Sequence, residues 1–174
     1  GKTLATADYD GTLLLWDAAT GITSTQLEGT ETFLASVVFS PDGETLATGA
    51  SGKIIKDGSG TVTEVRSGDV RLWNAVTGAT HTTFRGHSGA VHSMAFSPNG
   101  RTLATGGADK SVRLWNVATG TSKILSNSLM GGVTSLAFSP DGKTLALAID
   151  TSILLPQDHA IGIVARGEVW LWDM

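Results

Sequence analysis

Residues 112–116 read Val112-Arg113-Leu114-Trp115-Asn116, a short apolar run that ends in tryptophan and a polar residue. The same ending, Trp followed by Asp or Asn, occurs at Trp16-Asp17, Trp73-Asn74 and Trp172-Asp173. The four tryptophans are spaced 57, 42 and 57 residues apart. A signature that recurs at this interval indicates a repeated supersecondary unit, which needs neighbouring units to bury its faces.

A turn motif keeps the same spacing. Ser-Pro-Asp-Gly or Ser-Pro-Asn-Gly occupies residues 40–43, 97–100 and 139–142. Pro sets the first central φ of a tight turn, Asp or Asn tolerates the bend, and Gly accepts a positive φ. Each motif follows an apolar stretch ending in Phe and is itself followed by Thr-Leu-Ala. The motif therefore predicts two strands joined by a tight turn.

Two further strands complete the expected unit. The third strand carries the tryptophan and is closed by a Thr-Gly turn, at residues 20–21, 77–78 and 119–120. A more polar fourth strand follows, for example at residues 79–84. The pattern predicts four antiparallel strands per unit, connected as a meander.

The Trp-Asp endings, the Ser-Pro-Asp-Gly turns and the dipeptide Gly86-His87 resemble the WD-repeat β-propeller family. The resemblance covers essentially the whole chain, and it implies an all-β fold whose four-stranded blades ring a central channel. The four expected blades span about residues 1–28, 29–84, 85–126 and 127–174. Gly1 aligns with the last residue of the turn motif, and Met174 comes just after the fourth tryptophan. We therefore expect three, four, four and three strands, in an arc that is part of a larger ring or assembles into one.

A longer period overlies the first. Trp16 and Trp115 are 99 residues apart, as are Trp73 and Trp172. The sequence therefore contains two copies of a two-blade unit, in which a short blade is followed by a blade that is 15 residues longer. The long blades carry an insert between their second and third strands, at about residues 51–67 and 150–166. Two β-prone runs around a turn predict a hairpin in each insert. The duplication is consistent with a homodimer in which two four-blade arcs close an eight-bladed ring.

Composition bounds the classes of partner. The 174 residues are enough for one domain with a hydrophobic core. The chain contains no cysteine, which excludes disulfides and thiolate metal sites. The chain has no apolar run of membrane-spanning length, and together these absences favour a cytoplasmic protein. A formal charge of −4 without a cluster of Lys and Arg argues against a nucleic-acid partner.

The resemblance also implies a buried hydrogen-bond network in the third blade, made by His87, Thr105, Asp109 and Trp115. A catalytic interpretation would pair His87 with Asp109 as acid and base. The structural interpretation is favoured, because buried polar groups must be satisfied and these four satisfy one another.

The other blades depart from this network. Thr30 and Leu129 stand at the His87 position of the second and fourth blades, and Ser67 and Arg166 stand at the Asp109 position. The first blade keeps Asp10. We expect the two long blades to be held more by packing than by buried hydrogen bonds.

No catalytic, metal or cofactor site is expected. His81, His92 and His159 show no metal-ligand spacing. The Gly-rich stretches lack the Gly-Lys-Ser/Thr ending of a phosphate-binding loop, and no set of nucleophile, base and orienting group is visible. A small-ligand or enzymatic site at the ring centre is the least favoured alternative.

The inserts are the best candidates for an interaction surface, since they are too apolar for purely solvated loops. Packing within the molecule or against a second arc would explain them equally well. The candidate residues are Ile54, Ile55, Val62, Val65, Ile153, Leu154, Leu155, Ile161 and Ile163. The sequence thus predicts a non-catalytic scaffold for an unnamed protein partner, with a self-assembling structural repeat as the alternative.

Overall fold

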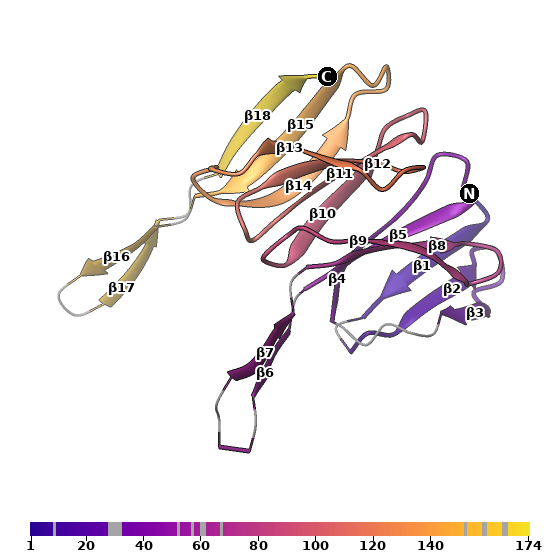
Figure 1. The fold of residues 1–174 in the computed structure, drawn as a ribbon, viewed down its shortest axis with the longest axis horizontal. Helices are drawn as coiled ribbons and strands as arrows, with labels where there is room; N and C mark the ends of the chain where they lie inside the picture. Colours follow the sequence, from indigo (N-terminus) through magenta and orange to yellow (C-terminus); the bar gives the residue numbers. More distant parts are fainter. Residues whose placement is uncertain are drawn as a thin grey trace.

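The computed structural model describes residues 1–8, 10–27, 33–51, 53–56, 58–59, 62–66, 68–151, 153–157, 160–164 and 167–174. The described residues form strands and turns, and four antiparallel sheets stand side by side (Figure 1). We call these sheets blades 1 to 4 in chain order. They contain three, four, four and three strands, which confirms the predicted all-β, four-blade partial propeller.

Each blade is a meander. Blade 1 has the strand order β1-β2-β3, blade 2 β4-β5-β8-β9, blade 3 β10-β11-β12-β13 and blade 4 β14-β15-β18. The bounds are β1 Thr3–Ala7, β2 Leu13–Asp17, β3 Thr23–Leu27, β4 Leu34–Phe39, β5 Thr45–Ala50, β8 Val70–Asn74, β9 Thr80–Phe84, β10 Val91–Phe96, β11 Thr102–Gly107, β12 Val112–Asn116, β13 Ser122–Ser126, β14 Gly132–Phe138, β15 Thr144–Asp150 and β18 Gly167–Asp173.

Four more strands form two separate hairpins. Strand β6 (Lys53–Lys56) pairs with β7 (Val62–Arg66), and β16 (Ile153–Gln157) pairs with β17 (Ala160–Val164). In the chain these hairpins come between the second and third strands of blades 2 and 4. Each hairpin is a two-stranded sheet that is separate from the blade sheets, and for these four strands the structure describes the backbone and its pairing.

The Asp or Asn after each tryptophan has a local structural reason. Asp17 Oδ1 accepts the backbone N–H groups two and three residues further on, at 2.9 and 2.8 Å. Asn74 and Asn116 make the same two bonds in blades 2 and 3. Gly21, which completes the turn in blade 1, has φ 67°, a left-handed conformation that glycine adopts without strain. The polar residue therefore closes the turn from the third strand to the fourth.

The hydrophobic core lies between adjacent blades. Three apolar clusters join blade 1 to 2, blade 2 to 3 and blade 3 to 4. At the central junction, Leu72 and Phe84 of blade 2 pack with Leu103 and Trp115 of blade 3. The rings of Phe84 and Trp115 are stacked, with centroids 5.0 Å apart. Each inner blade thus buries one face on the blade before it and the other on the blade after it.

Candidate functional site

The structure brings His87, Thr105, Asp109 and Trp115 together in one hydrogen-bonded chain. His87 Nδ1 lies 2.8 Å from Asp109 Oδ2, and His87 Nε2 lies 2.7 Å from Thr105 Oγ1. Trp115 Nε1 donates to the same hydroxyl at 2.8 Å. The histidine comes from the loop between β9 and β10, Thr105 from β11 and Trp115 from β12, so the chain ties that loop to the middle of blade 3.

Burial lowers the pKa of His87 below its ordinary value of 6.5, although the nearby Asp109 carboxylate acts in the opposite direction. The donor inventory agrees with a neutral ring. The indole N–H of Trp115 can only donate, so Thr105 Oγ1 accepts from it and keeps its own proton for His87 Nε2. The Nδ1–H group of His87 then donates to Asp109 Oδ2.

Burial favours the neutral form of Asp109, but its partners outweigh that effect. Hydrogen bonds from Ser111, from His87 and from the backbone of Ser88 hold the pKa of the Asp109 carboxyl below its usual value. Ser111 Oγ donates to Asp109 Oδ1 at 2.8 Å, and Ser88 N donates to Oδ2 at 3.0 Å. The carboxylate thus stays ionised inside a set of donors.

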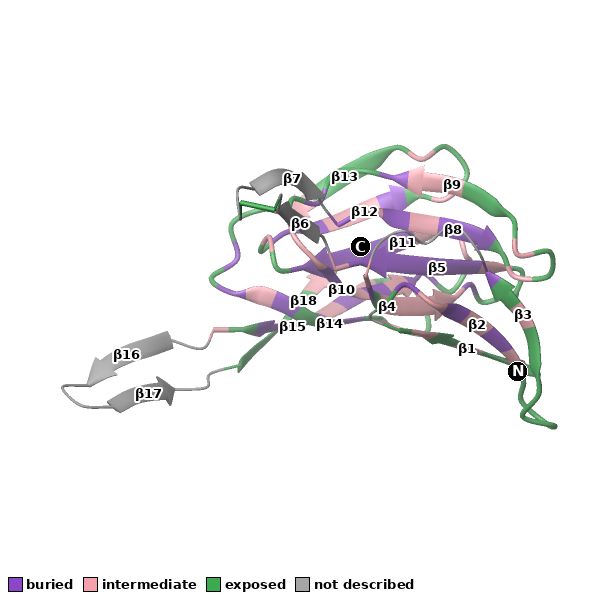
Figure 2. Cartoon of the chain, turned by 90° about the horizontal axis from the view of Figure 1, so that it is seen from below, coloured by how far each residue is buried: buried purple, intermediate pink, exposed green. Residues whose placement is uncertain are grey.

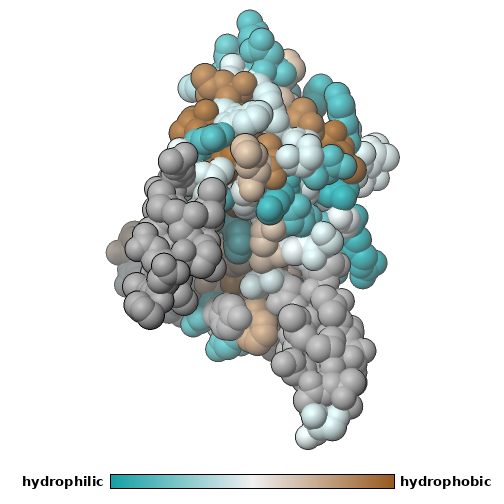
Figure 3. Space-filling model, turned by 90° about the vertical axis from the view of Figure 1, so that its left-hand side faces the viewer, coloured by the Kyte–Doolittle hydropathy of each residue, from teal (hydrophilic) through white to brown (hydrophobic). Residues whose placement is uncertain are grey.

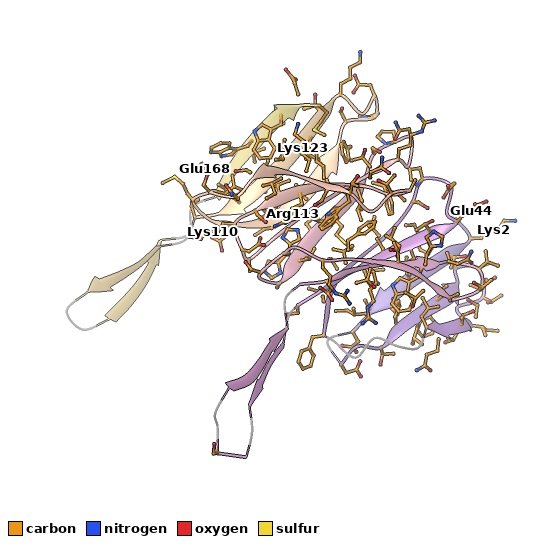
Figure 4. All side chains as sticks on the ribbon, in the orientation of Figure 1. Lys2, Glu44, Lys110, Arg113, Lys123 and Glu168 are labelled. Atoms are coloured by element: carbon orange, nitrogen blue, oxygen red, sulfur yellow. The ribbon has the colours of Figure 1, made fainter. Side chains whose placement is uncertain are left out.

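Arg113 of β12, labelled in Figure 4, also acts on this network, because its positive charge further disfavours protonated His87. A Cβ atom on Gly86 would lie 2.8 Å from Nη1 of Arg113, so the guanidinium passes close to the Gly86 backbone. Glycine at residue 86 leaves the space that this close approach requires.

The arrangement ties elements together and offers little access to a substrate. The side chain of His87 is 0% exposed and that of Asp109 is 7% exposed. Both ring nitrogens of His87 are already engaged. A general base must reach a substrate proton directly or through one water, and this geometry favours the structural role over an acid and base pair.

The sequence analysis missed a bond that blades 1 and 2 share with blade 3. Trp16 Nε1 donates to Thr6 Oγ1 at 2.8 Å, and Trp73 Nε1 donates to Thr48 Oγ1 at 2.9 Å. The sequence contains a signal for this bond, because the threonine that accepts it is the fourth residue of the recurring Thr-Leu-Ala-Thr at residues 3–6, 45–48 and 102–105. Blade 4 has Leu147 at this position, 1% exposed in the core between blades 3 and 4. Blade 2, a long blade, therefore keeps one buried polar link that we had not expected.

The other blade positions are placed as follows. Leu129 is 6% exposed and belongs to the apolar cluster between blades 3 and 4. Asp10 Oδ1 accepts the Thr12 N–H at 2.7 Å within its own turn. Thr30, Ser67 and Arg166 lie outside the described residues.

The candidate surface residues fall on the hairpin strands. Ile54 pairs with Val65 across β6 and β7, and Leu154 pairs with Ile163 across β16 and β17. The side chains of the nine predicted residues lie outside the described part of the chain. Their exposure stays a prediction.

Blade 4 carries an exposed apolar face that its sequence counterpart buries. Val169 and Leu171 of β18 are 74% and 70% exposed, whereas Val70 and Leu72, 99 residues earlier, are 0% exposed between blades 2 and 3. In Figure 3, hydrophobic residues gather in the upper part of the view, which is where blade 4 lies in Figure 1. The outward face of blade 4 is thus a second candidate for an interaction surface.

Neither a metal centre nor a membrane-spanning helix is found in the described part of the chain. The described residues contain no group of three His, Cys, Asp or Glu side chains that could hold a metal ion. They also contain no helix with the length and apolar character needed to cross a bilayer.

A family model described as "WD domain, G-beta repeat" matches residues 21–56, 78–116 and 123–155, and the chain belongs to this family. It is 30% identical over 137 residues to WD repeat-containing protein SL1-17 of Schistosoma mansoni, covering 63% of this chain and 45% of that protein. It is 30% identical over 140 residues to guanine nucleotide-binding protein G(I)/G(S)/G(T) subunit beta-1 of Homarus americanus, covering 63% and 41%. It is 32% identical over 111 residues to pre-mRNA-processing factor 19 of Oryza sativa subsp. japonica, covering 62% and 18%. The chain spans less than half the length of each of these relatives.

Proposed function

We propose that this chain is a non-catalytic scaffold that displays binding elements to protein partners. The observation that carries the proposal is the placement of two hairpins, β6–β7 and β16–β17, at the same point of alternate blades. The inserts begin 99 residues apart, in an arc whose blades are fixed by buried clusters. A rigid arc holds such elements in a constant relation to each other, which lowers the entropy lost on binding.

Membership of the WD-repeat family supports a scaffold role. One relative is named as a subunit of a guanine nucleotide-binding protein, so that protein works within an assembly. In such a scaffold, a few apolar anchors supply most of the binding energy while the surrounding contacts exclude water. The apolar residues of the two hairpins are our candidates for these anchors.

Shortening the hairpins tests this proposal. Residues 51–67 and 150–166 are each replaced by a turn of the length that joins β11 to β12 in blade 3. Binding partners captured by intact and trimmed chains are then compared by quantitative mass spectrometry. We expect the trimmed chain to keep its cooperative thermal unfolding and to lose its partners, and each single trim serves as a matched control. Undiminished partner binding by a folded, doubly trimmed chain would falsify the proposal.

Self-assembly is a second candidate, and the exposed face of blade 4 is the observation that favours it. By the 99-residue repeat, blade 4 corresponds to blade 2 and blade 1 corresponds to blade 3. Blade 2 packs on blade 3 in this structure, so the same kind of face on blade 4 would suit blade 1 of a second copy. Light scattering on a sizing column would then give twice the 18.0 kDa chain mass.

A further inference from the structure

Blade 3 is a basic segment of an acidic chain. Residues 85–126, which hold its four strands and its entry loop, contain five Lys or Arg and one acidic residue, Asp109. The whole chain contains 12 Lys or Arg and 16 Asp or Glu, so the remaining residues are strongly acidic on balance. Blade 3 is therefore the part of this chain whose charge suits a negatively charged partner.

A pocket of about 340 Å³ lies between blades 2 and 3, both of which have four strands. It is lined by the turn and outer strands of blade 2 and by residues 99–101 and 116–118 of blade 3. The two turns meet here, since a Cβ on Gly100 would lie 3.8 Å from Pro41. Figure 2 shows that β5 and β11 are largely buried, whereas β9 is exposed or half-buried over most of its length. The pocket thus opens where the core between these two blades ends.

Two asparagines of the pocket have a free amide group. Asn99 Oδ1 accepts two hydrogen bonds from its own turn, at 2.8 and 3.0 Å. Asn116 Oδ1 accepts two backbone N–H groups of its own turn, at 3.1 and 2.9 Å. In the part of the chain that the structure describes, neither Nδ2 group has a partner. Each asparagine therefore offers two N–H donors to a ligand.

Other blades have a carboxylate at these two positions. Asp42 and Asp141 stand at the position of Asn99, and each accepts the same serine hydroxyl and backbone N–H of its turn. Asp17 stands at the position of Asn116 and closes its turn with the same two bonds. The turns would therefore form equally well with Asp. What Asn changes in blade 3 is the chemistry of the pocket, because a donor replaces a negative charge.

Two nitrogen-rich side chains complete the lining. Arg101 and His81 are exposed, and among the described residues neither side chain has an ion-pair or hydrogen-bond partner. At the junction of blades 1 and 2, Glu44 and Ser24 stand at the positions of Arg101 and His81. The donor character of this pocket is thus a property of the junction between blades 2 and 3, and is not repeated with the fold.

Asp42 is the acidic residue of the lining. Hydrogen bonds from the Ser40 hydroxyl and the Glu44 backbone hold the pKa of the Asp42 carboxyl below its usual value. Both of these bonds go to Oδ1. Asp42 therefore stays ionised and can accept an N–H group that lies beside a bound anion.

We propose that this pocket binds the carboxylate of an acidic side chain in a partner protein. Arg101 pairs with the carboxylate, the amides of Asn99 and Asn116 donate to it, and Asp42 accepts a backbone N–H of the bound segment. The buried side chain of Leu72 and the half-buried side chain of Val117 form the apolar part of the lining, which suits an aliphatic neighbour of the acidic residue.

A phosphate group suits the pocket less well, because Asp42 would repel its second negative charge. The site involves neither hairpin, so it goes beyond the proposed hairpin scaffold and does not depend on it.

The test titrates the full 174-residue chain, labelled with ¹⁵N, with the peptide acetyl-Gly-Ser-Glu-Leu-Ser-Gly-amide. We expect the side-chain amide signals of Asn99 and Asn116 to shift, with a dissociation constant on the order of 100 µM. The same peptide with Gln in place of Glu should bind about tenfold more weakly, because its amide cannot accept charge-assisted hydrogen bonds. The peptide with phosphoserine in place of Glu should bind no more tightly than the Glu peptide.

Protein variants assign the binding to the pocket. Arg101→Gln should weaken binding of the Glu peptide about tenfold. Asn99→Asp should weaken it as much, because it removes a donor and adds a negative charge beside the ligand. It introduces the residue that blades 2 and 4 have in this turn, and thermal unfolding checks that the fold is kept. Lys143→Gln is the matched control, since Lys143 is exposed at the Arg101 position of blade 4, and it should leave the affinity unchanged.

Three results would overturn the proposal: unshifted amide signals of Asn99 and Asn116, equal affinity for the Glu and Gln peptides, or an affinity that Arg101→Gln leaves unchanged. Tighter binding of the phosphoserine peptide would also overturn it, because the ligand would then be a phosphate group. A wild-type dimer that Arg101→Gln dissociates would overturn it as well, since a second copy would be the occupant. The hairpin-trimmed chain should bind the Glu peptide as well as the intact chain does. That comparison distinguishes failure of this site from failure of the hairpin scaffold.

Discussion

The indole of Trp115 donates to the hydroxyl of Thr105 over 2.8 Å, and this bond clamps the second and third strands of blade 3. Blades 1 and 2 repeat the clamp with their own Trp and Thr. Among the residues that the structure describes, blade 3 extends it, through His87 and Asp109, to the loop that enters the blade. The turn between β11 and β12 carries Asp109, whereas blades 2 and 4 have a hairpin at that point of the chain. In blade 3, a short turn and a hydrogen-bonded entry loop occur together.

Replacing His87 by Ala should destabilise the fold by about 3 kcal/mol, because Asp109 and Thr105 each lose one hydrogen bond and the fully buried imidazole leaves a cavity. Urea unfolding followed by tryptophan fluorescence measures the change. His81→Ala is the matched control, since His81 is exposed on β9, and its effect should stay within about 0.5 kcal/mol. Equal effects of the two substitutions would contradict a structural role for the network.

Stability should fall as the pH is lowered below 6.5. The pKa of folded His87 lies below its ordinary value, so between the two pKa values the unfolded chain binds a proton that the folded chain does not. The contribution of His87 is complete above pH 6.5 and is lost as the pH falls through the folded pKa. Asp109 adds a second loss at lower pH, since its pKa is also depressed. The free energy of unfolding measured from pH 8 to 5 should slope less in His87→Gln, and parallel profiles would rule out this linkage.

Thr105→Val should cost more than Thr48→Val. Thr105 serves both Trp115 and His87, whereas the described partner of Thr48 is Trp73. Roughly 1 kcal/mol is expected for the single bond and about twice that for the double one, plus the cost of the stranded His87 nitrogen. Thermal unfolding of both variants checks the order. Blade 4 shows that an apolar residue fits, since Leu147 occupies this position.

The sequence predicted most of the fold because its turn chemistry is local. The Ser-Pro-Asp-Gly and Thr-Gly turns fix strand ends through backbone conformations that few residues adopt, and the tryptophan spacing sets the repeat. The clamp between Trp16 and Thr6 was missed, since a threonine among the alternating residues of a strand resembles any other β-prone residue. The exposure of the Leu4 and Val169 side chains could not be predicted from the sequence pattern either. Whether one face of a blade is buried depends on whether another blade packs against it.

Close packing between blades makes Gly106 intolerant of a side chain. A Cβ there would lie 2.6 Å from Cγ1 and 2.8 Å from Cβ of Val133 in blade 4, and a β-branched side chain cannot turn aside. Gly106→Ala should therefore destabilise by roughly 2 kcal/mol. Gly132→Ala is the control, because its Cβ would make ordinary contacts at 3.6 Å or more. Chemical unfolding of both variants measures the difference, and tolerance at Gly106 would mean that blades 3 and 4 move apart easily.

Leu171→Glu should abolish any pairing of arcs through blade 4. Leu171 is 70% exposed in the single chain, so a charge there leaves the fold stable, within about 0.5 kcal/mol. In a pair of arcs, residue 171 would be as buried as Leu72 is. Burying the unpaired carboxylate of Glu there would cost too much free energy for the arcs to pair. Light scattering should show twice the chain mass for the wild-type chain and for the control Val76→Glu, and a single chain mass for Leu171→Glu. A wild-type chain that runs as a monomer, or a Leu171→Glu dimer, would show that blade 4 does not meet a second copy through this face.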